Sequence, residues 1–491
     1  MTPDLDRCRR LATEGHTMIP VMRRLVADDL TPVSAMQRLS DEDYGFLFES
    51  VVGGERMARY SMLGVRPRVR LVGDLNQLRI EDANGSCEVI SGDPFVGIRT
   101  YMARFITPDL PDLPRFSGGL VGYFGYDTVR LAEHLPEAPP DRLGLPDIHL
   151  MRCDTLLVFD HSFNHLLLIT HLDLTVSGTD VVRAYGQAEA ELDALQSRLL
   201  TPAAPRLVGL AEVAPLSHHC HTPQERFLAS VEQIKDYIRA GDIFQAVASQ
   251  RLTAAISVNP FQVYRSIRSL NPSPYMFCLR LGPTSLVGAS PEIMVRVEDG
   301  TVVVRPIAGT IGRGATPAED AELAARLLAD PKERAEHVML IDLGRNDVGR
   351  VCEPGSVRLV ERMVIERYSH VQHIVSHVEG RLRPDLDALD ALRCCHPAGT
   401  VSGAPKIRAM QIIDEVEPVR RGPYAGAVGY LDFRGNLDTC IALRTAILTP
   451  GEAHVQAGAG IVADSIPDNE WRETMIKGQA MMQAIARAPQ F

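Results

Sequence analysis

Apolar and polar residues alternate along this chain in short blocks that predict a mixture of strands and helices. In the first two hundred residues, apolar or alternating runs predict strands at 46–50, 69–72, 78–80 and 156–159. Residues 181–200 carry apolar positions at helical spacing, and the glycine-rich segment 118–126 suits either a strand or a closely packed loop. Proline and polar residues at 201–205 and 217–221 then predict a linker.

A second region opens with a clear helix start. Thr222, Pro223 and Glu225 have the pattern of a capping box with proline at the first helical position, and Gly241 ends the helix. Further strands are predicted at 242–252, 285–297, 301–306, 426–433, 438–448 and 454–462. Further helices are predicted at 317–328, 331–343, 386–393, 406–415 and 468–487. Strands and helices that follow one another irregularly, without βαβ alternation, indicate an α+β fold with antiparallel sheets.

Composition and charge exclude several classes of protein. The 491 residues have room for two or three domains, or for one large fold with a continuous core. A net charge of −11 with scattered arginines offers no basic surface for nucleic acid. The nine cysteines include no Cys-x-x-Cys pair, which argues against a disulfide framework and against a zinc site. Because the sequence has no signal-peptide pattern and no apolar run of about 20 residues, we expect a cytoplasmic protein without a membrane segment.

The segment His396–Lys406 concentrates groups that can hold an anion. Two glycines allow close backbone approach, Thr400 and Ser402 supply hydroxyls, and Lys406 supplies a positive charge. Pro405 suits the first position of a helix, and helix N-termini attract anions. The spacing differs from that of a Walker loop. By itself the segment is equally compatible with an ordinary glycine-rich turn.

Two predicted helices each carry a pair of glutamates three residues apart. Glu333 and Glu336 share one helix face, and Glu470 and Glu473 repeat the arrangement near the C-terminus, with Lys477 four residues further on. Alone, each pair is most simply a solvated helix face. However, Mg²⁺ prefers oxygen ligands and uses one or two carboxylates together with water and substrate oxygens. Two such helices facing one cleft would therefore suit this ion.

Two segments near the C-terminus have the character of ligand contacts. Gly458, Ala459 and Gly460 form an open stretch of backbone at a predicted strand end. Arg444 lies among apolar residues in a predicted strand, which indicates either a buried partner or a half-exposed strand face.

Four segments together resemble the chorismate-utilising enzymes, and most closely the anthranilate synthase component I group of that family. They are Pro306–Thr310, Glu336–Leu343 followed by Arg345, Asn346 and Asp347, His396–Lys406, and Gln456–Gly460. The resemblance covers nearly the whole chain. It implies an α+β fold with large antiparallel sheets in a two-sheet, sandwich-like core surrounded by helices. It also implies an N-terminal region at 1–205 with a tryptophan regulatory pocket and a chorismate-binding catalytic region at 222–488, both sharing one core.

The resemblance also implies roles for individual residues. Glu336 and Glu473 match Mg²⁺ ligands, with Glu333 and Glu470 beside them acting through water. The positions that match chorismate contacts are Gly309, Thr310, Thr400, Tyr424, Arg444, Gly458, Ala459, Gly460 and Lys477.

The implied reaction has two steps. Ammonia attacks C2 of the chorismate ring as the 4-hydroxyl leaves, and pyruvate is then eliminated. Glu292 matches a general acid for the departing hydroxyl, a task that needs a raised pKa. His396 is expected to assist the elimination, either as a base or by positioning the intermediate.

Three positions separate this chain from related enzymes. Ala308 stands where aminodeoxychorismate synthases of the nucleophilic type carry lysine, and Gln245 stands where isochorismate-forming relatives carry a lysine that activates water. His396 stands where relatives that stop at an amino-chorismate more often have phenylalanine. These residues favour anthranilate formation. The alternatives are component I of an aminodeoxychorismate or aminodeoxyisochorismate synthase, and a non-catalytic tryptophan-binding homologue.

The resemblance further implies a partner and a feedback inhibitor. No Gly-x-Cys-x-Gly nucleophile motif is present, so we expect a separate glutamine amidotransferase subunit, component II, in a heterotetramer, or free ammonium. In this family L-tryptophan usually inhibits the first step of its own biosynthesis. Ser50, Pro274, Tyr275 and Met276 match the inhibitor pocket, although Phe48 stands where leucine is usual.

Overall fold

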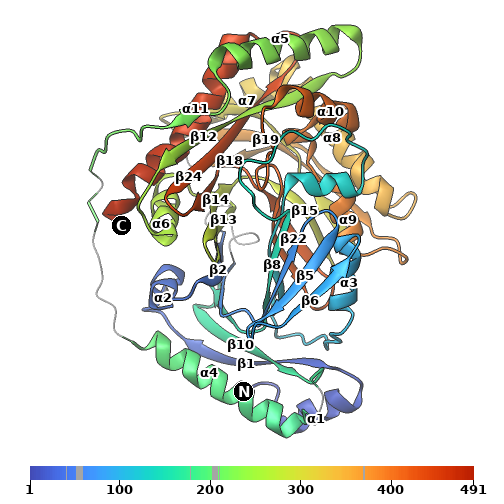
Figure 1. Cartoon of the computed structure of the whole chain (residues 1–491), viewed down its shortest axis with the longest axis vertical. Coiled ribbons are helices and arrows are strands. Elements are labelled where there is room, and N and C mark those ends of the chain that lie inside the picture. Colours follow the sequence, from blue (N-terminus) through green and yellow to red (C-terminus); the bar gives the residue numbers. More distant parts are fainter. Residues whose placement is uncertain (40, 51–58, 177–178, 202–207, 210, 369–370) are drawn as a thin grey trace.

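Two large antiparallel sheets form the centre of the molecule, and helices pack around them (Figure 1). The computed structural model describes residues 1–39, 41–50, 59–176, 179–201, 208–209, 211–368 and 371–491, and within these ranges each sheet has 12 strands. The predicted α+β fold with antiparallel sheets is therefore confirmed. No helix within those ranges combines the length and the apolar character needed to cross a bilayer.

The first sheet joins strands from both ends of the chain. In spatial order its strands are β1 (Met18–Val26), β10 (His165–Asp173), β9 (Leu156–Asp160), β3 (Tyr60–Val65), β2 (Tyr44–Glu49), β13 (Tyr275–Leu281), β14 (Thr284–Ser290), β23 (Thr445–Thr449), β24 (Glu452–Ile461), β12 (Gln245–Ala255) and β11 (His219–Cys220). The short β20 (Gly403–Ala404) also pairs with β12.

The second sheet is built in the same way. In spatial order its strands are β17 (Ile307–Gly312), β19 (Val371–Arg381), β16 (Thr301–Val304), β15 (Ile293–Glu298), β22 (Leu437–Ile441), β21 (Ala427–Asp432), β7 (Gly119–Phe124), β8 (Ile148–Cys153), β4 (Val69–Gly73), β5 (Gln77–Asp82) and β6 (Cys87–Ser91). A long strand, β18 (Arg358–Arg367), also pairs with β19. The glycine-rich segment at 118–126 thus contains a strand, β7.

The helices of the described ranges include all of those that the sequence predicted. They are α1 (Leu5–Thr13), α2 (Pro32–Arg38), α3 (Pro94–Met102), α4 (Val181–Leu199), α5 (Gln224–Ala240), α6 (Pro260–Leu270), α7 (Pro317–Ala329), α8 (Pro331–Val351), α9 (Ala388–Cys395), α10 (Lys406–Val416) and α11 (Pro467–Arg487).

Both sheets draw strands from the N-terminal and the C-terminal regions. β2 pairs with β13 in the first sheet, and β7 pairs with β21 in the second. The two regions therefore share both sheets. The assignment of regulation to one region and catalysis to the other stays a prediction, and most of the predicted linker at 201–205 lies outside the described residues.

Two segments that were each predicted as one strand form two strands, and the two strands belong to different sheets. The segment 285–297 breaks at Pro291 into β14 and β15, and the segment 438–448 breaks before Arg444 into β22 and β23. Proline cannot donate a ladder hydrogen bond, and Arg444 has a left-handed backbone with φ of 47°. The two connections lie together, since Ala289 N donates to Arg444 O at 3.2 Å and Ile441 N donates to Glu292 O at 3.0 Å.

Three predicted helix ends also differ from the structure. The capping box at Thr222 is not formed, because α5 begins at Gln224 with Pro223 as its N-cap and the Thr222 side chain is buried. Pro405 is the N-cap of α10 rather than its first residue. Helix α8 runs eight residues beyond the predicted end at 343, to Val351, because buried apolar residues continue along it.

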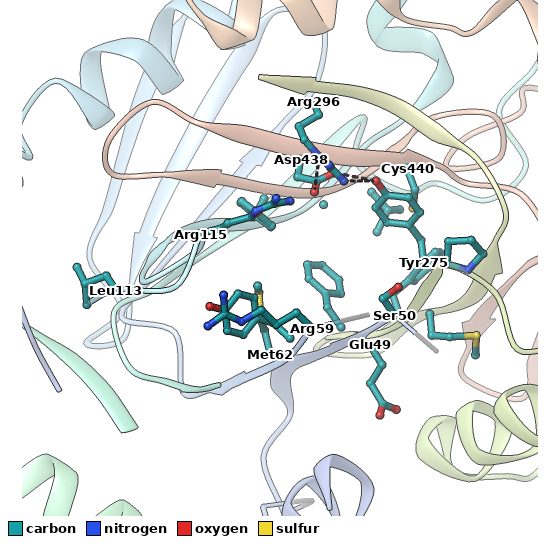
Figure 2. A pocket seen from close by; sticks show the side chains of 18 residues that line it. Glu49, Ser50, Arg59, Met62, Leu113, Arg115, Tyr275, Arg296, Asp438 and Cys440 are labelled. Carbon is teal, nitrogen blue, oxygen red and sulfur yellow. Dashed lines mark hydrogen bonds and ion pairs between the residues drawn. The ribbon is translucent and has the colours of Figure 1, made fainter. Parts of the chain in front are cut away.

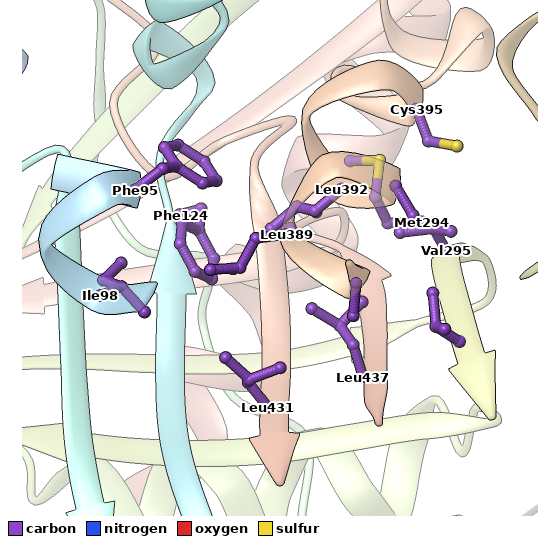
Figure 3. Close-up of a cluster of buried hydrophobic side chains, with 14 of the residues drawn as sticks. Phe95, Ile98, Phe124, Met294, Val295, Leu389, Leu392, Cys395, Leu431 and Leu437 are labelled. Carbon is purple, nitrogen blue, oxygen red and sulfur yellow. The ribbon is translucent and has the colours of Figure 1, made fainter. Parts of the chain in front are cut away.

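A large apolar cluster holds α3 and α9 against the second sheet (Figure 3). Leu389 and Leu392 of α9 pack in this cluster with Phe124 of β7 and Leu431 of β21. Burial of such side chains is the dominant favourable contribution to folding. Because His396 directly follows α9, this packing fixes where that histidine lies.

Candidate functional site

Glu292 lies in the connection between β14 and β15, where the chain passes from one sheet to the other. Its side chain is buried, and burial raises the pKa of its carboxyl to about 8. Thr400 Oγ1 donates to both carboxylate oxygens, at 3.0 and 3.1 Å. The structure therefore brings together two residues 108 positions apart that were predicted for one site. At neutral pH most of the Glu292 carboxyl is protonated.

His396 is buried at the C-terminal end of α9. Its Nε2 lies 3.1 Å from the backbone carbonyl of Tyr126, so the ring donates there and its lone pair is on Nδ1. Nδ1 is also buried and has no hydrogen-bond partner in the described part of the chain. Burial lowers the pKa of His396 to about 4. The imidazole is therefore neutral at pH 7 and a weak base.

Lys406 does not face an open anion site, contrary to the sequence-based expectation. Its Nζ donates to Asp347 Oδ2 at 2.7 Å and lies within 3.5 Å of the carbonyl oxygens of Cys394 and Cys395. The ammonium thus compensates a buried carboxylate on α8 and the free carbonyls at the end of α9. Lys406 holds the glycine-rich turn in place.

Gln245 and Glu336 meet at the start of β12. Gln245 Nε2 donates to Glu336 Oε1 at 3.5 Å, and the Gln245 side chain is buried. A Cβ atom at Gly460 would lie 2.5 Å from Gln245 Nε2. The Gln245 amide fills the space beside Gly460, so Glu336, Gln245 and Gly460 lie at one place.

Lys477 of α11 links Glu473 to β24. Lys477 Nζ donates to Glu473 Oε1 at 2.6 Å and to Gly458 O at 3.0 Å. A Cβ at Gly458 would lie 2.9 Å from the hydroxyl of Tyr424. Gly458 and Gly460 are two residues apart on β24 and therefore share one face. The Ala459 side chain points the other way into an apolar cluster, so only its backbone can contact a ligand on this face.

The first glutamate of each pair, Glu333 or Glu470, is partly buried. Burial and the neighbouring Glu336 raise the pKa of Glu333, and burial raises the pKa of Glu470, with Glu473 adding to the effect. Lys332 of α8 lowers the pKa of Glu470, so α8 and α11 are close enough for their charges to interact. Among the described residues, no three His, Cys, Asp or Glu side chains lie close enough together to hold a metal ion. The four-glutamate Mg²⁺ site therefore stays a prediction.

Gly309 and Thr310 lie on β17, beside the N-terminal turn of α8. A Cβ at Gly309 would lie 3.0 Å from Glu333 Oε2, and φ at Gly309 is 66°, which favours glycine. His373 Nδ1 lies 3.0 Å from Gly309 O and 3.1 Å from Thr310 Oγ1. His373 of β19 thus fixes this segment, and no sequence motif had indicated it.

The sequence predicted that Arg444 lies within a strand. In the structure it lies in the connection between β22 and β23. Its side chain is accessible to solvent, yet desolvation by the surrounding protein lowers its pKa. Its charge also lowers the pKa of His373. No carboxylate pairs with Arg444 in the described part of the chain. This cation is therefore open to an anionic ligand.

A separate pocket of about 550 Å³ lies between the two sheets (Figure 2). Ser50, Pro274, Tyr275 and Met276, the four residues predicted for an inhibitor pocket, all line it. Further polar residues that line it were not predicted from the sequence: Glu49, Arg59, Arg115, Arg296 and Asp438. Glu49 directly precedes the predicted Ser50, whereas the other four lie in strands or loops that carry no recognisable motif.

One ion-paired group crosses this pocket from sheet to sheet. Tyr275 of β13 donates to Asp438 Oδ1 of β22 at 3.0 Å, and Arg296 of β15 donates to Asp438 Oδ2 at 3.0 Å (Figure 2). The hydroxyl oxygen of Ser50 is buried and has no hydrogen-bond partner within the described residues. The pocket therefore contains both charged groups and an available hydroxyl.

Comparison with known proteins places this site in a family. The family model described as chorismate binding enzyme matches residues 69–483. Anthranilate synthase component 1 of Acinetobacter calcoaceticus is 49% identical over 98% of this chain and 98% of its own length. The corresponding protein of Acetivibrio thermocellus is 47% identical over 99% of both chains. This chain belongs to the chorismate-binding enzyme family, in the anthranilate synthase component I group.

Two solved structures have a similar fold. The crystal structure of anthranilate synthase component I from Streptococcus pneumoniae is 40% identical, with a TM-score of 0.78 over 94% of this chain and 99% of that one. A menaquinone-specific isochorismate synthase from Escherichia coli shares 18% identity and a TM-score of 0.70 over 98% of both chains. At that identity the second likeness shows the fold alone.

Proposed function

We propose that this protein is the aminating subunit of anthranilate synthase and converts chorismate and ammonia into anthranilate and pyruvate. The observation that carries the proposal is the buried Glu292, whose pKa of about 8 keeps a proton available beside the glycine-rich turn. The close relatives named anthranilate synthase component 1 support the same reading. The product would be the first intermediate committed to tryptophan.

The substrate would lie between Glu292 and the Gly458–Gly460 face. Arg444 and nearby backbone amides would bind a carboxylate of chorismate, because a guanidinium recognises that group well. Tyr424 and Lys477 would line this space, because both contact Gly458. Thr310, which contacts His373, would approach the substrate from β17. Thr400 would orient the Glu292 carboxyl, which protonates the departing 4-hydroxyl.

His396 is better suited to positioning than to proton abstraction. Its pKa of about 4 makes it a poor proton acceptor at neutral pH. With Nε2 held by the Tyr126 carbonyl, the ring has one orientation and one tautomer. Gln245 carries no basic group, which fits a reaction in which ammonia attacks without activation of water.

Carboxylate oxygens are the type of ligand that Mg²⁺ takes. Glu336 and Glu473 would hold the ion, with Glu333 and Glu470 beside them, because Mg²⁺ takes few direct carboxylates and completes its shell with water and substrate oxygens. The raised pKa values of Glu333 and Glu470 reflect burial and like-charge repulsion that a divalent cation would relieve. When bound, Mg²⁺ would act as a Lewis acid on the ring carboxylate. Lys477 would have to release Glu473 for this purpose.

Regulation and assembly complete the proposal. L-tryptophan would bind in the 550 Å³ pocket between the sheets, with Ser50, Pro274, Tyr275 and Met276 around it. A glutamine amidotransferase subunit, component II, would supply ammonia within a heterotetramer in the cytoplasm. The term component 1 in the names of the relatives supports the existence of a second subunit.

One assay tests the proposal directly. The purified chain is incubated with chorismate, ammonium and Mg²⁺, and anthranilate fluorescence and pyruvate are followed together. We expect both products in equal amounts, and inhibition by tryptophan. An amino-chorismate product without pyruvate would instead identify an aminodeoxychorismate or aminodeoxyisochorismate synthase. Tryptophan binding without any turnover would identify a non-catalytic homologue.

A further inference from the structure

Arg421 is one of the largest fully buried side chains in the molecule, and no sequence motif singled it out. Its guanidinium makes a two-point contact with Glu417, with Nε donating to Oε2 at 2.9 Å and Nη2 donating to Oε1 at 2.6 Å. The side chains of both residues are almost inaccessible to solvent, at 1% and 4%. A buried ion pair of this kind needs further hydrogen bonds to offset the cost of desolvation.

Arg421 finds those further partners in two segments of the candidate site. Nη1 donates to Val401 O at 2.6 Å, within the glycine-rich turn between His396 and Lys406. Nη2 donates to Val247 O at 2.7 Å on β12, in register with Gly460 of β24. One side chain thus ties the turn that carries Thr400 to the strand that begins at Gln245.

Glu417 extends the same connection. Its Oε1 accepts hydrogen bonds from Ser249 N at 2.8 Å and from Ser249 Oγ at 2.7 Å. Ser249 is in register with Gly458, and its Oγ also accepts from Gln456 Nε2 at 2.8 Å. The carboxylate therefore fixes β12 and β24 at the place where their backbones face the site.

The guanidinium of Arg421 lies over two aromatic rings of the site. The Arg421 Cζ atom lies 4.8 Å from the centre of the Tyr126 ring and 5.6 Å from that of Tyr424. The Tyr126 carbonyl accepts the hydrogen bond that orients His396, and the Tyr424 hydroxyl lies against Gly458. Arg421 therefore contacts residues that hold or adjoin four predicted site residues, which come from distant parts of the sequence: His396, Thr400, Gly458 and Gly460.

We propose that Arg421 and Glu417 are positioning residues that hold two parts of the active site in place. They set the distance between the glycine-rich turn, which carries Thr400 and orients Glu292, and the Gly458–Gly460 face. This inference rests on the proposed function. Neither residue touches the substrate; both act through the backbone of β12 and of the turn. Catalysis depends steeply on such placement, since a shift of about 1 Å can lower a rate on the order of a hundredfold.

The chain offers a matched control for general destabilisation. Arg152 is also buried, makes a two-point contact with Asp154 at 2.8 Å for both bonds, and lies over the ring of Phe105 at 4.4 Å. It lies on β8, and its ion-pair partners, Asp154 and Asp173, are not residues of the candidate site. Replacing either arginine by lysine keeps the positive charge but loses the planar two-point contact. Arg152→Lys therefore shows how much stability and kcat change when a buried two-point contact is lost outside the candidate site.

The experiment compares Arg421→Lys, Glu417→Gln and Arg152→Lys with the unchanged chain. Melting temperature, tryptophan binding stoichiometry and ammonium-dependent kcat and KM for chorismate are measured well below each melting temperature. We expect Arg421→Lys to lower kcat per folded molecule by about tenfold to a hundredfold. We expect Arg152→Lys to lose similar thermal stability but to keep kcat within about threefold. Glu417→Gln should resemble Arg421→Lys, and it replaces that variant if the lysine protein does not fold.

Three results separate the failure of this inference from the failure of the proposed function. If the unchanged chain makes anthranilate and Arg421→Lys keeps kcat within about threefold, the positioning role is wrong while the function stands. Equal losses of kcat in Arg421→Lys and Arg152→Lys would also overturn it, because the loss would then be structural. If the unchanged chain makes no anthranilate, the function itself is wrong.

Discussion

The hydroxyl of Thr400 donates to both carboxylate oxygens of Glu292, at 3.0 and 3.1 Å, although burial raises the pKa of that carboxyl to about 8. The two influences oppose each other, because a hydrogen bond donated to a carboxylate stabilises its charged form. The pKa of Glu292 therefore depends on the glycine-rich turn that carries Thr400 as well as on the burial of Glu292 itself.

A general acid works only while protonated, so its contribution is complete below its pKa and is lost as the pH rises through it. We expect kcat/KM for chorismate to fall as the pH rises through about 8. Thr400→Val removes the hydrogen-bond donor and raises the pKa of Glu292 further. The fall in kcat/KM should then occur at higher pH. Rate profiles between pH 6 and pH 10 of both proteins provide the measurement. If kcat/KM falls at the same pH in both proteins, a group other than Glu292 causes the fall.

Glu473→Gln tests the predicted Mg²⁺ site. The amide keeps the shape of the side chain but loses the charge that would hold the ion, so we expect Mg²⁺-dependent turnover to fall by at least about a hundredfold. Tryptophan binding should remain. The matched control is Glu189→Gln on the exposed face of α4, which should leave turnover unaffected. Full activity of Glu473→Gln would remove Glu473 from the metal site.

Gly460→Ala tests the close approach of β24 to Gln245. The new Cβ would lie 2.5 Å from Gln245 Nε2, so the amide that contacts Glu336 must shift. We expect kcat/KM to fall about tenfold or more, with only a small change in melting temperature, because the glutamine side chain can move more easily than backbone. Gly186→Ala is the control, since nothing lies within 4 Å of its added methyl group. Unchanged kinetics for Gly460→Ala would show that the position of Gln245 is unimportant.

Ser50→Leu tests the pocket between the sheets. A larger apolar side chain would occupy part of the 550 Å³ volume and remove the buried hydroxyl. We expect the dissociation constant for tryptophan, measured by calorimetry, to rise about tenfold or more, since a lost buried hydrogen bond and a steric conflict both oppose binding. Inhibition of turnover should weaken in proportion. Undiminished inhibition would place the tryptophan site elsewhere.

Much of the fold followed from local pattern, and its errors have identifiable causes. The helices at 181–199 and 467–487 have long, regular periods, and both were predicted within a residue or two of their ends. The breaks at Pro291 and Arg444 were missed because apolar residues resume directly after them, although the strands on either side belong to different sheets. Periodicity describes which face of an element is buried, but it does not say against which sheet.

The sequence by itself determined the chemical groups of this protein: the acid at Glu292, the glutamate pairs, the glycines of β24 and the α+β pattern. These are local properties, because residue type and spacing alone set charge, backbone freedom and period. Only the tertiary structure decided that Lys406 serves Asp347 and the end of α9, that His396 is held by the Tyr126 carbonyl, and that Arg421 joins the turn to β12. Such contacts depend on burial and on the pairing of distant strands, so the roles of these residues are set by their surroundings rather than by their identity.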